Sequence, residues 1–154
     1  MLAIEMPGLR NAWLVAPKLI RSAQPDPDTF QRLASARVNN VIDLREPGEH
    51  DTVLEKSQCE AAGMSYINHP LSEWEVPGQD QIVAILTDIS KAIALGQTSV
   101  VHCKRGADRT GVVCACFQSS SGLAKSQIFS DLHQGGLLEV WLLVAVVEYM
   151  EDHK

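Results

Sequence analysis

One short segment carries a thiol, several cations and a glycine, and it is the part of the sequence best suited to chemistry. It covers residues 102–111 and reads His-Cys-Lys-Arg-Gly-Ala-Asp-Arg-Thr-Gly. The apolar run 98–101 precedes it and a helix-like run, 110–117, follows, which predicts a buried strand, a tight loop and the start of a helix. Such a loop directs backbone N–H groups and the positive end of a helix dipole toward one point, so it favours the binding of an anion.

The residue types in this segment predict phosphoryl transfer to sulfur. Cys103 is the candidate nucleophile, because thiolates are stabilised near helix N-termini and cations. Arg109 follows after five residues, and its planar guanidinium can donate to two phosphate oxygens at once, which a lysine cannot do. In-line attack on phosphorus would leave a phosphocysteine that water then hydrolyses. The expected phosphate cradle consists of Lys104, Arg105, Gly106, Ala107, Asp108 and Arg109.

This pattern of His-Cys, five residues, Arg and then Ser or Thr resembles the signature loop of the cysteine-based protein tyrosine phosphatases. His102, Cys103, Arg109 and Thr110 match that loop position by position. Upstream, Ile-Arg-Ser-Ala-Gln-Pro at 20–25 and Val-Ile-Asp-Leu-Arg at 41–45 resemble the opening strands of small bacterial dual-specificity-like members. The resemblance implies a phosphatase without metal or other cofactor that acts on phosphotyrosine, phosphoserine and phosphothreonine in proteins.

Two residues that flank the loop have supporting roles in this interpretation. His102 is expected to orient the loop from behind through hydrogen bonds rather than to act as a general base. The hydroxyl of Thr110 has two interpretations: it bonds to the backbone of the first helical turn, or it stabilises the departing thiolate of Cys103. The resemblance supports the second.

The general acid that protonates the leaving oxygen is not decided by the sequence. Members of the resembled family usually supply an aspartate from a separate upstream loop, but the corresponding stretch, 71–80, has none at the expected place. Glu73 and Glu75 have suitable chemistry there, and Asp80 stands at the expected start of a helix. Asp108 is the other candidate, and its alternative role is to fix the loop by accepting hydrogen bonds.

Substrate class is also left open. Lys104 and Arg105 are either solvated charges or cations that favour a substrate with more than one phosphate. The second interpretation makes an inositol phosphate or phosphoinositide phosphatase the alternative function. Ala107 stands where those enzymes often carry another lysine. A catalytically inactive phosphate-binding module would require loss of the nucleophile or the clamp, and both are present. Trp74 is either a core aromatic residue or a wall of the pocket.

Composition predicts one globular domain that spans residues 1–154, with 45% apolar residues and a formal net charge of −6. An acidic chain has no global attraction to nucleic acid, and no apolar stretch is long enough to span a membrane. The expected partner is therefore a phosphorylated protein or a small phosphorylated molecule, bound by a monomer. A reducing cytoplasm is the expected compartment, with three further cysteines buried as small apolar residues: Cys59, Cys114 and Cys116.

The order of strands and helices predicts an α/β fold with a central, mostly parallel sheet flanked by helices, and with the signature loop between a central strand and a helix. Expected strands are 18–21, 38–44 and 65–68; expected helices are 29–35, 52–62 and 82–93, with two or three more after the loop. Residues 1–17 are expected to be an irregular lead-in, and 137–149 a packed core helix. Asp43 and Arg45 are expected to form an internal ion pair.

Overall fold

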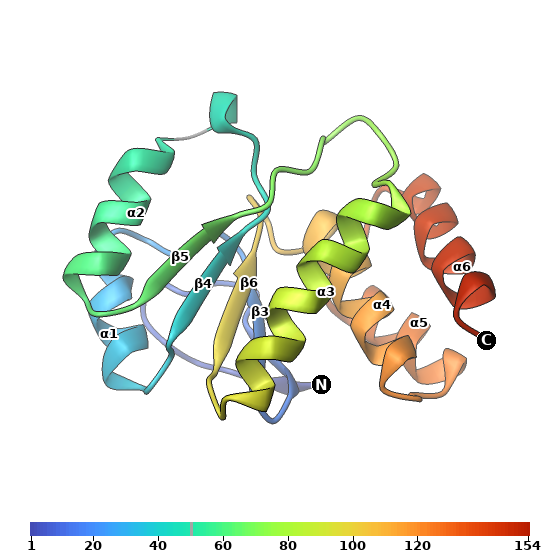
Figure 1. The fold of residues 1–154 in the computed structure, drawn as a ribbon, viewed down its shortest axis with the longest axis horizontal. Coiled ribbons are helices and arrows are strands. Elements are labelled where there is room, and N and C mark those ends of the chain that lie inside the picture. Colours follow the sequence, from blue (N-terminus) through green and yellow to red (C-terminus); the bar gives the residue numbers. More distant parts are fainter. Residues whose placement is uncertain (50) are drawn as a thin grey trace.

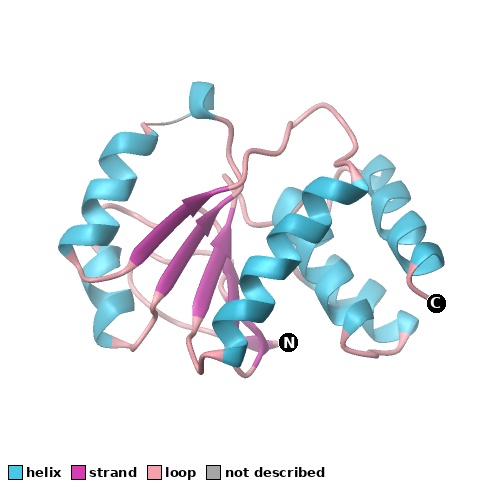
Figure 2. Ribbon diagram, viewed as in Figure 1, coloured by secondary structure: helices cyan, strands magenta, loops and turns pink. Residues whose placement is uncertain are grey.

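The computed structural model, which describes residues 1–49 and 51–154, has one mixed β-sheet between two layers of helices (Figures 1 and 2). The strand order is β1-β2-β3-β6-β4-β5, and the four strands from β3 to β5 are mutually parallel. β1 and β2 extend this sheet as antiparallel strands beside β3. The strands are β1 (Leu2–Ala3), β2 (Trp13–Ala16), β3 (Leu19–Ser22), β4 (Asn40–Asp43), β5 (Ser65–Asn68) and β6 (Ser99–His102).

Helices cover both faces of the sheet, as parallel strands require. Figure 1 shows α1 and α2 on one face and α3, α4, α5 and α6 on the other. The α-helices are α1 (Thr29–Ser35), α2 (Thr52–Ala61), α3 (Gln79–Ala94), α4 (Arg109–Ser120), α5 (Lys125–Gln134) and α6 (Leu143–Asp152), and η1 (Pro47–Glu49) and η2 (Val140–Leu142) are 3₁₀ turns.

The central strand β6 is buried on both faces, which fixes the position of the loop that follows it. Val100 packs into the apolar cluster beneath α1 and α2, and Val101 packs into the cluster formed with α3, α4 and α6. Side chains of a strand alternate between faces, so the apolar run 98–101 is the pattern of a strand with a core on each side. The carboxyl end of β6 therefore emerges between the two helical layers, where Cys103 begins the loop.

The predicted α/β fold with a mostly parallel sheet is confirmed. The helix 29–35 and the strand 65–68 have the predicted bounds, and the strand predicted at 38–44 spans only 40–43. The prediction of an irregular segment at 1–17 is wrong, because β1 and β2 lie within it. β1 has two residues and β2 has four, so their apolar pattern is too brief to show a strand period, and β2 also pairs with β3 through a register shift.

The C-terminal helix packs in the core as predicted, but α6 spans Leu143–Asp152 rather than the predicted 137–149, and the 3₁₀ turn η2 precedes it. The side chains of Ala145, Val146 and Tyr149 are buried against the α3–α4 layer. Within the part of the chain that the structure describes, no helix is both long and apolar enough to cross a membrane.

Candidate active site

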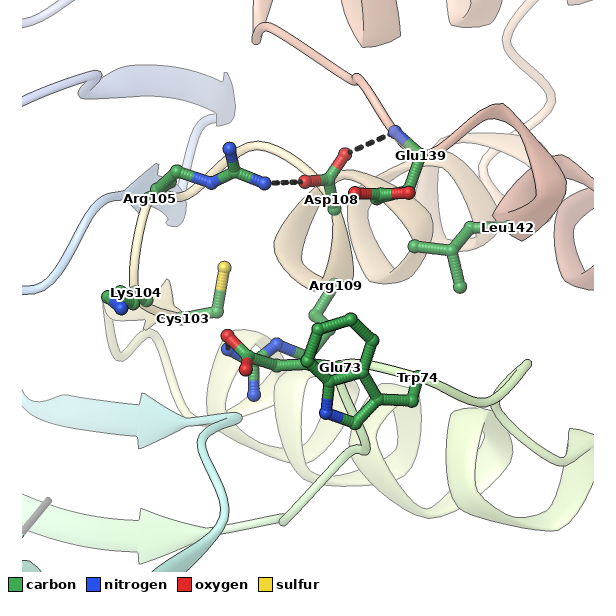
Figure 3. A pocket seen from close by; sticks show the side chains of 9 residues that line it. All are labelled: Glu73, Trp74, Cys103, Lys104, Arg105, Asp108, Arg109, Glu139 and Leu142. Atoms are coloured by element: carbon green, nitrogen blue, oxygen red, sulfur yellow. Dashed lines mark hydrogen bonds and ion pairs between the residues drawn. The ribbon is translucent and has the colours of Figure 1, made fainter. Parts of the chain in front are cut away.

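The loop between β6 and α4 forms the floor of a small pocket at the carboxyl edge of the sheet, where open α/β sheets place ligands. We call residues 103–108 the signature loop. The pocket encloses about 120 Å³ and lies above Cys103, whose side chain is almost fully buried (Figure 3). The loop and the start of α4 contribute five lining residues, and two other segments contribute Glu73, Trp74, Glu139 and Leu142.

Gly106 is required at its position by both conformation and space. Its φ of +69° lies in the left-handed region, which side-chain-bearing residues rarely adopt. A Cβ atom there would also overlap the backbone of Ser22 and Ala23, on the segment that leaves β3. The loop therefore packs directly against the chain after β3.

Arg109, the predicted clamp, is held in place by Glu49 from the 3₁₀ turn η1. The two terminal guanidinium nitrogens donate to the two carboxylate oxygens of Glu49 at 2.6 and 2.8 Å. The same nitrogens also donate to the carbonyl of Leu71 at 3.1 Å and to Glu73 at 3.3 Å. Burial alone would lower the pKa of Arg109, but Glu49 and the nearby Cys103 raise it, so the guanidinium stays charged.

Glu49 is a residue of this site that the sequence analysis did not find. Burial would raise the pKa of its carboxyl, but the hydrogen bonds from Arg109 and from the N–H of Glu46 lower it below its usual range. It pairs with a residue 60 positions away. A glutamate that follows a Pro-Gly pair in a loop carries no local signal for such a pairing.

The four predicted acid candidates have different places in the structure. Glu73 lines the pocket with its carboxylate near Arg109, and about a third of its side chain is exposed. Asp108 also lines the pocket, but both of its oxygens accept hydrogen bonds: Oδ1 from the N–H groups of Leu138 (2.8 Å) and Glu139 (3.0 Å), and Oδ2 from Arg105 (2.7 Å). Glu75 and Asp80 are exposed and do not line the pocket.

Glu139 is a second pocket residue that the sequence analysis missed. It lies beyond Asp108 on the opposite side of the pocket from Glu73 (Figure 3). Its Oε2 accepts a hydrogen bond from the indole Nε1 of Trp141 at 2.8 Å. Trp74 is 83% exposed and lines the pocket, so it is a wall residue rather than a core aromatic.

His102 lies fully buried behind the loop in a network of charged side chains. Its Nε2 is 2.8 Å from Glu55 Oε1, and its Nδ1 is 3.2 Å from the carbonyl oxygen of Cys103. Arg45 pairs with both Glu55 and Asp43, which includes the ion pair predicted from the sequence. Burial alone would raise the pKa of Asp43, but the charge of His102 and the hydrogen bonds from Arg45 lower it to about 2.

Asp43, Glu55 and His102 bring potential metal-ligand atoms within 4.8 Å of one another. The Arg45 guanidinium already pairs with both carboxylates. We therefore interpret the cluster as an ion-pair network that holds the strand end before Cys103. Thr110 is fully buried, and its hydroxyl has no hydrogen-bond partner among the described residues.

The other three cysteines lie in the core, and we expect them to react far more slowly than Cys103. Burial raises the pKa of Cys59 and Cys116 to about 12 and that of Cys114 to about 11. Because only the thiolate is nucleophilic, iodoacetamide near neutral pH should label Cys103 first. Peptide mapping of the folded protein after brief labelling measures this order. Earlier labelling of Cys59, Cys114 or Cys116 would contradict it.

Comparisons with known proteins agree with this geometry. Residues 15–122 match the family model described as "Polymorphic toxin system, DSP-PTPase phosphatase". The phosphatidylglycerophosphate phosphatase PTPMT2 of Arabidopsis thaliana is 31% identical over 100 residues, which are 64% of this chain and 43% of that protein. The chain spans less than half the length of the curated relatives that it matches.

Solved structures share the fold over nearly the whole chain. Tk-PTP in its active form superposes with a TM-score of 0.81 at 20% identity, covering 97% of this chain and 100% of that one. The core catalytic domain of the PP-IP phosphatase SIW14 from S. cerevisiae gives 0.77 at 18% identity, covering 94% and 86%. Because the family model covers well over half of the sequence and includes the whole signature loop, the chain belongs to the DSP-PTPase phosphatase family, within the superfamily of cysteine-based phosphatases.

Proposed function

We propose that this phosphatase hydrolyses phosphomonoesters through a phosphocysteine intermediate and that its substrates are phosphorylated protein side chains. The observation that carries the proposal is the position of Cys103 on the floor of a pocket that is also lined by the charged clamp Arg109, the first residue of α4. An anion above Cys103 would interact with the helix N-terminus and with the guanidinium together.

In the first step, the thiolate of Cys103 attacks phosphorus in line with the ester oxygen. The S–P bond forms and the P–O bond breaks, while the electron pair stays on the leaving oxygen, which takes a proton from the general acid. Loop N–H groups and Arg109 stabilise the three equatorial oxygens, where negative charge accumulates. In the second step, water attacks phosphorus and gives its proton to the same carboxylate. The S–P bond breaks and the thiolate is restored, with Thr110 as a hydrogen-bond donor to the departing sulfur.

Phosphate binding would break the contact between Glu73 and Arg109. The four N–H groups on the terminal nitrogens of Arg109 face Glu49, Leu71 and Glu73. A phosphate that binds along the Nε edge of the guanidinium must take the place of the longest of these bonds, the 3.3 Å contact with Glu73. Glu73 would then be released into the pocket at the moment when the substrate arrives.

Glu73 is therefore our assignment for the general acid. It reaches the pocket, is partly exposed and has a contact that substrate binding replaces. Both carboxylate oxygens of Asp108 instead accept hydrogen bonds. This supports its alternative role, which is to fix the loop rather than to act as the acid. Glu75 and Asp80 lie outside the pocket lining.

Replacing Glu73 by glutamine should slow the hydrolysis of a phosphate ester with a poor leaving group, such as an alkyl phosphate, by about 10²-fold or more, because general acids contribute on that order. p-Nitrophenyl phosphate, whose leaving group needs little protonation, should be affected only a few-fold. The kcat values of both substrates are measured for Glu73→Gln, Asp108→Asn and the matched neighbour Glu75→Gln. An unchanged ratio between the two substrates in Glu73→Gln, together with a large change in Asp108→Asn, would transfer the role to Asp108.

The charge of the pocket favours substrates that carry a single phosphate. Three cations line it, Lys104, Arg105 and Arg109, but three carboxylates line it as well, those of Glu73, Asp108 and Glu139. Arg105 is paired with Asp108, so its charge is largely neutralised. A polyphosphorylated inositol would bring several more negative charges to a rim without surplus cations, whereas one phosphate on a protein side chain matches the clamp alone.

A phosphate-release assay with phosphopeptides, inositol phosphates and phosphoinositides tests the substrate class. The volume of about 120 Å³ and the exposed Trp74 wall indicate a shallow pocket. We therefore expect kcat/KM values for phosphotyrosine, phosphoserine and phosphothreonine peptides that lie within about a hundredfold of each other, or about 2.7 kcal/mol at the transition state. A preference of more than a hundredfold for an inositol phosphate or a phosphoinositide over every peptide would overturn the proposed substrate class in favour of that alternative.

A further inference from the structure

The carbonyl groups of the signature loop are anchored by a segment that the catalytic chemistry has not used. Four consecutive peptide carbonyls, at positions 104–107, each accept a hydrogen bond from the chain between residues 11 and 24. These bonds are Gln24 N–H to Lys104 O (3.1 Å), Asn11 Nδ2 to Arg105 O (3.1 Å), and one guanidinium nitrogen of Arg21 to Gly106 O (2.7 Å) and Ala107 O (3.3 Å).

These bonds determine where the N–H groups of the loop point. In a trans peptide the C=O and N–H groups point in opposite directions, and the described residues contain no cis peptide. Holding the carbonyls of residues 104–107 toward the outer segment therefore directs the N–H groups of residues 105–108 to the other side, into the pocket above Cys103. None of these four N–H groups has an acceptor among the residues that the structure describes.

Arg21 supplies two of the four bonds from a site inside the protein. Its side chain leaves β3 and is only 1% exposed. No described carboxylate forms an ion pair with it, so its positive charge lies beneath the loop without a neutralising partner. The guanidinium is packed against Gly135 at the end of α5, where any Cβ atom would collide with it.

Asn11 ties the loop to the same helix end. Its Nδ2 donates both to Arg105 O at 3.1 Å and to Gly135 O at 2.9 Å, and its Oδ1 accepts a bond from Trp13 Nε1 at 2.8 Å. The residue has a φ of +46°, a conformation that asparagine tolerates better than most residues. Hydrogen bonds thus fix both the nitrogen and the oxygen of the Asn11 amide. Asn11 lies just before β2, in the antiparallel extension formed by β1 and β2.

We infer that Arg21 and Asn11 are positioning residues that preorganise the phosphate cradle: they aim the loop N–H groups at the phosphate without touching it. This inference rests on the proposed use of the signature loop as an anion site. It gives the N-terminal antiparallel extension a role in the site, since Asn11 reaches the loop only because β2 continues the sheet beside β3.

The test compares two alkylating agents that attack the same thiol. Iodoacetate is an anion and uses the cradle, whereas iodoacetamide is neutral and does not. The ratio of their second-order rates at Cys103 therefore reports anion attraction rather than thiol access or folding. Arg21→Met should lower this ratio about tenfold, the value of one charge-assisted hydrogen bond. Asn11→Gly should lower it by about two- to fivefold, because the bond from Asn11 to Arg105 O is neutral and solvent-exposed. Arg21→Lys, which keeps the charge but has a less suitable donor geometry, should restore part of it.

Asn11→Gly introduces no charge and accepts the positive φ without strain, so its result does not depend on long-range electrostatics. Gly135→Ala tests the bonds from Arg21 to the loop without changing Arg21 itself, because the added methyl group should displace the guanidinium. This variant should therefore also lower the ratio. If an Arg21 variant does not fold, Asn11→Gly and Gly135→Ala decide the outcome. Leu19→Ala on the same strand is the control, since it should lower Tm and leave the ratio unchanged.

A wild-type ratio in folded Asn11→Gly and in folded Arg21→Met would overturn the inference. The wild-type protein separates this failure from failure of the proposed function. A high iodoacetate ratio without p-nitrophenyl phosphate turnover would retain the cradle and reject the catalysis. Normal turnover with equal rates for iodoacetate and iodoacetamide would retain the proposed catalysis and reject the preorganised cradle.

Discussion

Cys103→Ser should lower phosphatase turnover by about 10⁴-fold or more, about 5.5 kcal/mol at the transition state, because a serine hydroxyl in this pocket is not ionised near neutral pH. The side chain is buried on the pocket floor and differs from serine by one atom, so the fold and the loop N–H groups should persist. The measurements are kcat with p-nitrophenyl phosphate and the binding of inorganic phosphate by calorimetry.

Cys114→Ser is the matched control for this experiment, because Cys114 is a buried thiol in α4 that does not line the pocket. It should keep turnover within a few-fold of wild type while it lowers Tm. Turnover of Cys103→Ser close to that of wild type would exclude a phosphocysteine intermediate. Mass spectrometry of acid-quenched wild-type protein provides an independent check, since a phosphoryl adduct should appear on the peptide with Cys103.

Arg109→Lys should lower kcat/KM by about 10²- to 10³-fold, the usual loss when a preorganised donor to transition-state charge is removed. A lysine ammonium keeps the charge but cannot present two parallel N–H groups to a phosphate. It also cannot form both bonds to Glu49, so the turn η1 should lose its anchor. Steady-state kinetics over a range of substrate concentrations should show the loss in kcat as well as in KM.

Arg32→Lys is the control for a general arginine effect, because Arg32 forms an exposed ion pair with Asp28 on α1, far along the chain from the loop. It should leave both kinetic constants unchanged. An Arg109→Lys variant that retains more than a third of wild-type kcat/KM would show that the guanidinium fork is not needed, and that charge alone holds the phosphate.

The sequence by itself determined the chemistry of the signature loop and the elements on either side of it. Cys103, Gly106 and Arg109 lie within seven residues, so their relation depends on local geometry: a strand end, a positive φ and the first turn of a helix. The alternation of strands and helices likewise predicts the parallel sheet, because consecutive parallel strands require helical crossovers. The buried ion pair of Asp43 with Arg45 was predictable for the same reason, since the two residues are near neighbours.

The tertiary structure alone decided which distant side chains support the site. Glu49 reaches Arg109 across 60 positions, and Arg21 reaches Gly106 across 85. No local pattern marks either partner, because β3, η1 and the signature loop meet only when β3 and β4 pair on opposite sides of β6. The tertiary structure also distinguishes Glu73 from Glu75, which look equivalent in sequence. Only the path of the chain before α3 places Glu73 in the pocket and Glu75 in solvent, because the packing of that segment, and not its composition, decides which carboxylate faces Arg109.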